Sequence, residues 1–272
     1  MVDPAVAIEA PSISPMLLVL AGAFVGMFVG LTGVGGGALM TPILVLGFGL
    51  PPVTAVATDL AFAAITKLAT SIVHFRSKNV DTRVLWRLWS GSIPACIVVG
   101  VLVGVGWLGN WNQYLLTPMA VMIALSGLSL LLARRVQSRR TEERLANPES
   151  FKRLQTPFTV CAGIGLGAIV AATSIGAGAI GAALLRALYP LRMTPIRLVA
   201  TDTVHAIPVT LIAGGTYAAL GQTDWTLLLW LLAGSLPVAV VASMVASRLS
   251  PSWLRGLLGV TLLVLSAKML LA

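Results

Sequence analysis

The sequence GLTGVGGGA at residues 30–38 interrupts a long apolar run, and AATSIGAGAIG at residues 171–181 interrupts another. Each glycine costs a helix interior about 1 kcal/mol relative to alanine, so neither stretch is expected to continue as regular helix. Glycine also allows tight turns and lets other groups approach the main chain closely. The two stretches therefore predict unwound segments within hydrophobic helices.

The sequence around the two breaks is repeated as well. Ala57-Thr58-Asp59 returns as Ala200-Thr201-Asp202, and Gly91-Ser92 with Pro94 returns as Gly234-Ser235 with Pro237. Many secondary transporters build their substrate site from a duplicated hydrophobic unit whose copies each carry an interrupted helix. The repeat therefore favours a membrane transporter.

The composition excludes an ordinary soluble domain, which carries about 25% charged residues. This chain has 57% hydrophobic and 10% charged residues among its 272. The formal net charge of +9 lies in short loops between apolar segments, where the positive-inside rule explains it without nucleic acid. The tail at residues 1–14 has no lysine or arginine, so it lacks the basic start of a signal peptide. Cys96 and Cys161 stand alone and have no metal-ligand spacing.

The basic residues indicate the topology. Two of the apolar segments are too long for one straight crossing of roughly 30 Å. If each of these folds back as a hairpin, the loops that share one side hold 15 of the 18 basic residues, and the opposite loops hold none. The long segments are 15–48 and 157–190, the others are 54–75, 88–107, 114–133, 198–219, 227–247 and 255–272, and the basic loops are 76–87, 134–156, 190–197 and 248–255.

The predicted fold is an all-α polytopic membrane protein with two inverted-topology repeats, each a glycine-broken helical hairpin plus three transmembrane helices. A hairpin plus three crossings is an odd number, so the second copy faces the opposite way. The expected organisation is an external tail, a first membrane repeat, a basic cytoplasmic loop and a second membrane repeat, at residues 1–14, 15–133, 134–156 and 157–272. This places the chain in a bacterial-type inner membrane with its N-terminus outside. Full crossing and re-entrance of the hairpins give the same parity, and both stay open.

The breaks are the expected substrate site. The arm after each break starts near the membrane centre, where its free N–H groups and positive dipole end suit an anion. Backbone unwound at that depth must be buried in protein or line a wet cavity. Tight helix packing is the alternative role for such glycines, and it is the one expected for Gly22, Gly26 and Gly30. The residues assigned to the break sites are Thr32, Gly33, Gly35, Gly36, Gly37, Thr173, Ser174, Gly176 and Gly178.

Ionisable residues inside predicted spans are costly and usually functional. Lys67, near the middle of its span, either neutralises the anion or pairs with a carbonyl or carboxylate. His205 binds the anion, carries a proton or is a satisfied core histidine. Asp59 and Asp202 occupy equivalent places; we interpret them first as helix-end or gating hydrogen-bond acceptors and second as proton carriers.

The first break, Gly30-Leu31-Thr32-Gly33-Val34-Gly35-Gly36-Gly37, followed by Pro42 and Ala57-Thr58-Asp59, resembles the sulfite/organosulfonate exporter family (TauE/SafE, also called the toluenesulfonate uptake permease family). The resemblance covers essentially the whole chain, although the second break, Thr173 to Gly178, is degenerate. It implies a small inner-membrane protein that moves an anion such as sulfite, sulfoacetate or an organosulfonate. Neither a cofactor nor a metal is expected, and the oligomeric state stays open.

Several alternatives remain at the level of sequence. An anion channel and a proton-coupled carboxylate transporter of the same fold are the nearest; an intramembrane enzyme and an accessory subunit are more distant. No HExxH, GxSxG or GxxxxGK[ST] motif is present, so neither hydrolytic chemistry nor ATP hydrolysis is expected. A membrane potential that is negative inside favours anion efflux by roughly 2.3 kcal/mol per charge per 100 mV. Export can therefore run uncoupled, whereas uptake needs co-transported protons.

Overall fold

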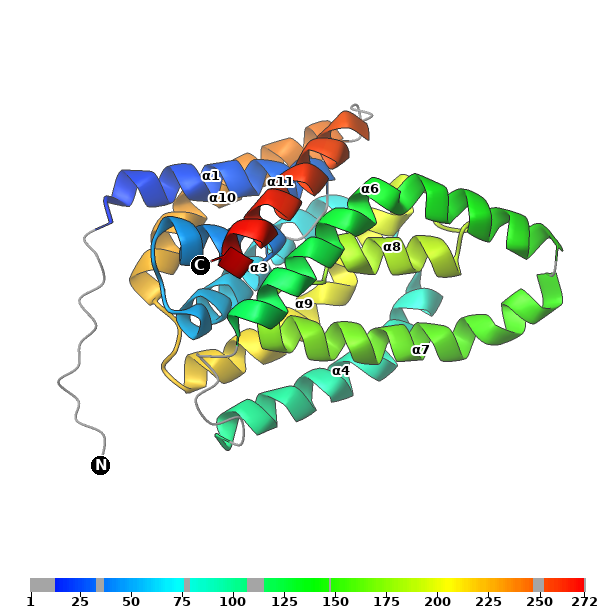
Figure 1. Ribbon diagram of the computed structural model, residues 1–272, viewed down its shortest axis with the longest axis horizontal. Coiled ribbons are helices and arrows are strands. Elements are labelled where there is room, and N and C mark those ends of the chain that lie inside the picture. The colour runs from blue at the N-terminus through cyan, green and yellow to red at the C-terminus, as the bar shows by residue number, and fades with distance from the viewer. Residues whose placement is uncertain are drawn as a thin grey trace.

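The chain folds into a bundle of α-helices (Figure 1). The computed structural model describes residues 13–32, 37–75, 79–106, 115–146, 148–246 and 252–271. Within these ranges, eight helices are long and apolar enough to cross a membrane. The fold is therefore the all-α polytopic membrane protein that the sequence predicts.

The N-terminal half begins with a full-length helix and a half-length arm. α1 spans Pro15–Thr32; the arm consists of α2, Gly37–Pro42, and a π-helical turn η1, Ile43–Gly47. The remaining helices of this half are α3 (Pro52–Phe75), α4 (Thr82–Gly104) and α6 (Leu116–Ala146).

The C-terminal half repeats this order. α7 spans Pro148–Thr173 and the short arm α8 spans Ala179–Leu188. They are followed by α9 (Pro195–Ala219), α10 (Trp225–Ala246) and α11 (Ser252–Leu271). The repeated prolines sit at matching places: Pro52 and Pro195 open α3 and α9, and Pro94 and Pro237 lie inside α4 and α10. Proline suits the first helical turn, where its missing N–H has no intrahelical partner.

The sequence predicts a loop at residues 134–156, but most of this stretch is helical. α6 continues through Ala146 and α7 starts at Pro148, so the basic stretch extends two membrane helices. The 31 residues of α6 reach about 46 Å, well beyond the thickness of a bilayer core. Arginine, glutamate, leucine and alanine are good helix formers, which explains why this polar stretch stays helical. In Figure 1 the two extensions meet at one end of the molecule, far from the end of α11.

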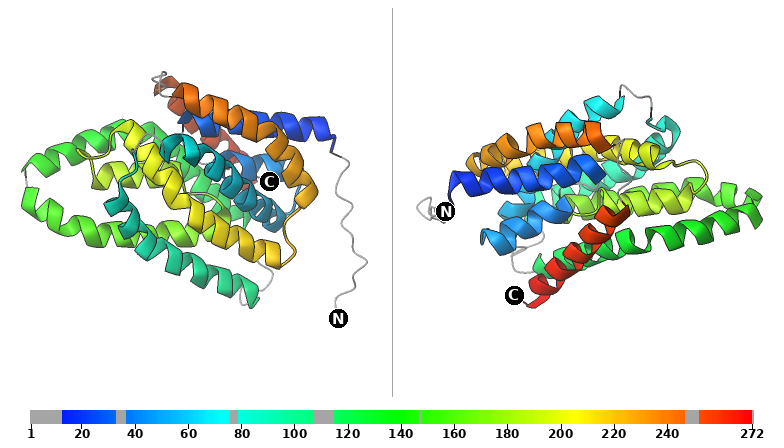
Figure 2. Two further views of the ribbon diagram at one scale, coloured as in Figure 1. Left: turned by 180° about the vertical axis from the view of Figure 1, so that it is seen from behind. Right: turned by 90° about the horizontal axis from the view of Figure 1, so that it is seen from above.

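Glycines let the two halves pack against each other in equivalent ways. α1 lies beside α10, and α7 lies beside α4 (Figure 2). In both pairs a glycine sits directly on a partner carbonyl, where an added Cβ would collide. The matched contacts are Gly22 on Leu231 and Gly163 on Leu88; Gly26 on Ser235 and Gly167 on Ser92; Gly234 on Val19 and Gly91 on Val160. The packing role expected for Gly22, Gly26 and Gly30 agrees with these contacts, because Gly30 sits on the Ala239 carbonyl in the same way.

The two halves also make a pair of equivalent hydrogen bonds to each other. The Asp81 N–H donates to Thr201 Oγ1 at 3.0 Å, and the Asp224 N–H donates to Thr58 Oγ1 at 3.1 Å. Both aspartates also accept a hydrogen bond from the first turn of the helix that follows them. The repeated Ala-Thr-Asp motif of each half therefore holds the start of a helix that belongs to the other half.

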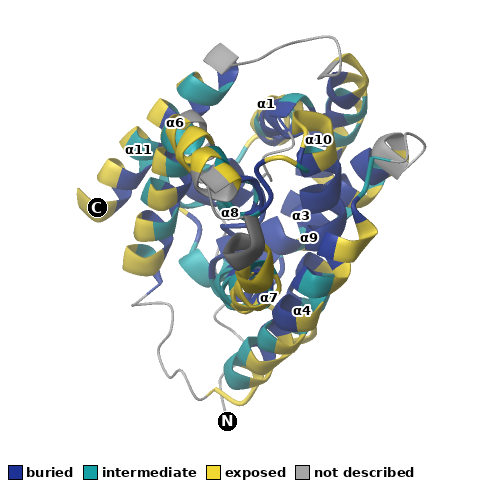
Figure 3. Ribbon diagram, turned by 90° about the vertical axis from the view of Figure 1, so that its right-hand side faces the viewer, coloured by how far each residue is buried: buried dark blue, intermediate teal, exposed yellow. Residues whose placement is uncertain are grey.

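Equivalent helices of the two halves run antiparallel where they meet. Along α6 and α11, Gly127 faces Gly259, and Ser266 Oγ donates to the Ala120 carbonyl at 2.8 Å, so numbering rises in one helix as it falls in the other. α3 and α9 follow the same rule, since Gly214 lies on Leu60 while Lys67 lies in the electrostatic field of Asp202. Figure 3 shows this α3–α9 pair as the most buried part of the bundle.

Candidate functional site

The second glycine break is an unwound segment between α7 and α8. Helix ends at Thr173 and resumes at Ala179. Gly176 and Gly178 have φ values of 124° and 129°, which favour glycine, and Ser174 has φ of 60°, which is uncommon for a residue with a side chain. The break predicted at Ser174, Gly176 and Gly178 is therefore present as irregular backbone, and it lies buried inside the protein.

The first break meets the second. α1 ends at Thr32 and α2 starts at Gly37; the predicted site residues Gly33, Gly35 and Gly36 lie outside the described residues. Gly37 packs directly on the main chain of Ser174, where an added Cβ would collide with the carbonyl and come within 3.1 Å of the hydroxyl oxygen. The structure thus brings the two half-length arms, α2–η1 and α8, to one place.

Asp59 of α3 lies at this meeting point with no exposed surface. The Thr41 hydroxyl of α2 donates a hydrogen bond to its Oδ2. The Ser174 side chain lies beside the same carboxylate. Asp59 Oδ1 and Ser174 Oγ have no hydrogen-bond partner among the described residues. Asp59 therefore links α3 to the first arm through its Oδ2, while its Oδ1 has no hydrogen-bond partner among the described residues.

Asp202, the equivalent residue of α9, lies against the start of the second arm. A Cβ on Gly181, in the first turn of α8, would collide with Asp202 Oδ1, and the Gly178 amide faces the carboxylate. The side chain is 1% exposed, and neither oxygen has a hydrogen-bond partner among the described residues. Each half thus directs one aspartate at the arm of its own break.

Lys67 and His205 complete the polar centre. Lys67 of α3 is 3% exposed, its ammonium has no hydrogen-bond partner among the described residues, and it interacts electrostatically with both Asp59 and Asp202. His205 Nε2 shares a hydrogen bond of 2.9 Å with Ser92 Oγ, and its Nδ1 has no partner among the described residues. Lys67 therefore interacts with one carboxylate from each half, and both roles predicted for it stay open.

The hydroxyl groups of the two predicted site threonines that flank the breaks donate to their own helices. Thr32 Oγ1 donates to the Phe28 carbonyl at 2.6 Å, and Thr173 Oγ1 donates to the Ile169 carbonyl at 2.8 Å. Thr173 Oγ1 also accepts from the Ile175 N–H at 3.2 Å. In this conformation both hydroxyls stabilise the ends of α1 and α7, so their donors are already engaged.

Three residues of the centre were not among those predicted from sequence. Thr41 holds Asp59, Ser92 holds His205, and Gly181 makes room for Asp202. Ser92 belongs to the repeated Gly-Ser-x-Pro motif, which could have identified it. Thr41 and Gly181 have no such signal, because their partners lie on another helix.

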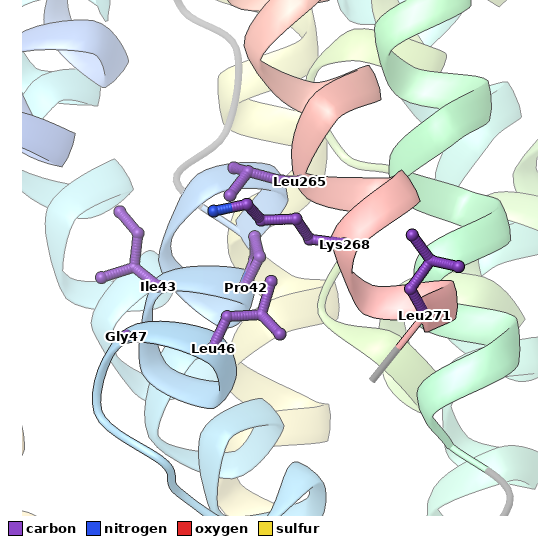
Figure 4. A pocket seen from close by; sticks show the side chains of 7 residues that line it. All are labelled: Pro42, Ile43, Leu46, Gly47, Leu265, Lys268 and Leu271. Atoms are coloured by element: carbon purple, nitrogen blue, oxygen red, sulfur yellow. The ribbon is translucent and has the colours of Figure 1, made fainter.

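Two surface hollows lie away from this centre. One, of about 520 Å³, lies between the first arm and α11 and is lined by Pro42, Ile43, Leu46, Gly47, Leu265, Lys268 and Leu271 (Figure 4). Another is an apolar crease between α1 and α10. Asp59, Lys67, Asp202 and His205 are each at most 3% exposed, so these side chains are closed off from solvent in this conformation.

Eight apolar helices around a closed polar centre, at which two interrupted helices from different halves meet, define a polytopic membrane protein of the transporter class. Residues 18–269 match the family model described as sulfite exporter TauE/SafE. The chain belongs to this family.

Curated relatives agree with this assignment. The chain is 34% identical over 262 residues to "Probable membrane transporter protein YjnA" of Bacillus subtilis (strain 168), covering 93% of this chain and 98% of the relative. It is 25% identical to "Probable membrane transporter protein YdhB" of the same organism, over 84% of this chain and 89% of the relative. A "Probable membrane transporter protein" of Xylella fastidiosa (strain 9a5c) is 26% identical over 85% of this chain and 84% of its own length. No solved structure gives a significant match.

Proposed function

We propose that the protein is a secondary transporter that carries a small sulfur-containing or organic anion, of the sulfite, sulfoacetate and organosulfonate class, across the inner membrane by alternating access. Membership of the TauE/SafE family supports transport and the substrate class. The observation that carries the location of the site is Lys67. Its buried ammonium has no hydrogen-bond partner among the described residues, and it interacts electrostatically with Asp59 and Asp202, the two aspartates that lie against the arms of the breaks. A buried charge without a partner is costly unless a ligand or another charge compensates for it.

In this proposal the substrate anion binds between Lys67 and the start of α8. The break residues Gly37, Ser174, Gly176 and Gly178 let main chain and substrate approach closely, and the free amides at the start of α8 add donors. His205, held by Ser92, is the further polar ligand. Asp59 and Asp202 are the gating or proton-coupling positions, since each links one arm to the α3–α9 pair.

The exchange of contacts between the halves supports alternating access. The proposed halves are inverted repeats, because equivalent helices pack antiparallel and because each half holds a helix start of the other. Rocking one half against the other then opens the shared centre to one side at a time. The basic ends of α6 and α7 are placed in the cytoplasm on the positive-inside rule, and the N-terminus outside.

Counterflow in proteoliposomes tests the proposal. Vesicles loaded with unlabelled sulfite or sulfoacetate are expected to accelerate entry of the labelled anion, because a carrier returns faster when it is loaded. Protein-free vesicles and vesicles with Lys67→Met are the controls. Flux that rises without saturation and ignores the trans anion would instead indicate a channel, and no flux of any anion of this class would refute the substrate assignment.

A further inference from the structure

The Asp202 carboxylate occupies a place that suits a bound anion. It lies against the first turn of α8, a ten-residue helix, where Gly181 has no side chain and the Gly178 amide faces it. The start of a helix carries unpaired N–H groups and the positive end of the dipole, which attract negative charge. Lys67 adds its field from α3. A position of the centre that attracts anions is therefore taken by the protein's own carboxylate.

This carboxylate is poorly held for a buried charge. Both of its oxygens lack a hydrogen-bond partner among the described residues, although the side chain is 1% exposed. The centre holds two carboxyl groups, Asp59 and Asp202, against one ammonium, Lys67. An incoming anion would make that imbalance worse, because burying like charges together is strongly unfavourable. Substrate binding there requires that one carboxylate loses its charge.

We propose that the Asp202 carboxylate, while it is ionised, occupies the place of the substrate anion at the start of α8. On protonation it releases that place to the anion. One proton is then taken up with each anion bound, which makes the proton a co-transported ion. The proposal rests on the transporter function above. It assigns the coupling to Asp202 rather than to Asp59 or His205.

The groups around Asp202 are consistent with this role. From α3, Lys67 interacts electrostatically with Asp202 and also with Asp59 and His205. His205 follows Asp202 by three residues on α9 and is held by Ser92 of α4. Its neighbour Thr201 accepts a hydrogen bond from Asp81, whose carboxylate is paired with Arg192. Arg87 of α4 donates to Tyr189 at 3.2 Å, and Arg186 lies in the last turn of α8, away from the start that Asp202 faces. Lys67 is thus the cation that Asp202 shares with a substrate.

Asp59 provides the matched comparison. It is equally buried and equivalent in the repeat, but it accepts a hydrogen bond from Thr41. The arm that it holds, α2, has only six residues before it changes to a π-helical turn. A carboxylate that is held by a hydroxyl is expected to stay in place when the anion binds. Asp59→Asn and Asp202→Asn therefore remove the same charge from positions with different proposed roles.

The experiment is calorimetric binding to detergent-purified protein at several pH values. Sulfoacetate, methanesulfonate and thiosulfate are the probes, because their charges do not change near neutral pH, whereas sulfite itself takes up a proton there. Uptake of one proton by the wild type predicts that Kd weakens about tenfold per pH unit between about pH 6 and about pH 8. In Asp202→Asn the Kd should become independent of pH and tighter than that of the wild type at the alkaline end. Asp59→Asn should keep the tenfold slope, whatever its absolute affinity.

Three results would overturn the proposal. They are an unchanged slope in Asp202→Asn, a slope that Asp59→Asn removes instead, and loss of binding in a folded Asp202→Asn. If none of the probes binds the wild type at any pH, the proposed function itself fails, which is a distinct outcome. In proteoliposomes, an anion gradient should drive proton uptake through the wild type but not through Asp202→Asn.

Discussion

Replacement of Lys67 by methionine is expected to weaken anion binding strongly while leaving a folded protein. Methionine keeps most of the length of the side chain and removes the one ammonium that acts on both central carboxylates. Two unit charges 4 Å apart attract by about 4 kcal/mol at an effective dielectric constant of 20. Removal of one member of a buried, hydrogen-bonded charge pair costs about 2–5 kcal/mol in measured complexes. We therefore expect a loss of about 2–4 kcal/mol, or about 30- to 1,000-fold in Kd.

Calorimetry with sulfoacetate measures this loss directly, and thermal unfolding without ligand checks the fold. Lys268→Met is the matched control. Lys268 lies on α11 beside the surface hollow of Figure 4 and is exposed, so its removal should change Kd by less than about twofold, as expected for a remote, solvated charge. An unchanged Kd in Lys67→Met, or an equal loss in Lys268→Met, would remove Lys67 from the anion site.

Two further predictions use glycines and aspartates that occur in comparable settings. Gly37→Ala should reduce the flux measured in proteoliposomes at least about tenfold, because overpacking on the Ser174 main chain costs about 1–3 kcal/mol. Gly104→Ala is the control and should leave the flux unchanged, because a Cβ at Gly104 meets open space. Asp81→Asn should lower the free energy of unfolding by about 1 kcal/mol more than Asp224→Asn. Asp81 has an ion pair with Arg192, which is partly exposed, whereas Asp224 has no ion pair among the described residues. Equal losses in the two aspartate variants, measured by denaturant titration, would contradict that reasoning.

The sequence was sufficient to predict the membrane-spanning helices and the second break, whereas the first break, at Gly33, Gly35 and Gly36, lies outside the described residues. Apolar segments of spanning length, and glycines too dense for a helix, are local signals. They located α3, α9 and the unwound Ser174 to Gly178 segment. The stretch at 134–156 was misjudged because its charges were interpreted as a loop, although the same residues favour a helix outside the membrane.

The contacts of the centre could not be predicted from sequence. Periodicity tells which face of a helix is buried, but it does not tell which helix covers that face. The repeated Ala-Thr-Asp motif marked Thr58 and Thr201 as equivalent, yet only the fold shows that each accepts a hydrogen bond from the other half. For the same reason, the contacts of Asp202 with α8 and of Asp59 with Thr41 came only from the structure.

The inverted arrangement of the two halves is the central claim, and labelling of two equivalent loop positions tests it most directly. Asn79 and Gln222 precede the paired Asp81 and Asp224 by two residues in each half. Single cysteines at these positions, in a protein without Cys96 and Cys161, can be labelled in intact cells with a membrane-impermeant maleimide. The account predicts that the cysteine at 222 reacts from outside and the one at 79 only after permeabilisation. Reaction of both from the same side would show parallel halves and contradict the proposed transport mechanism.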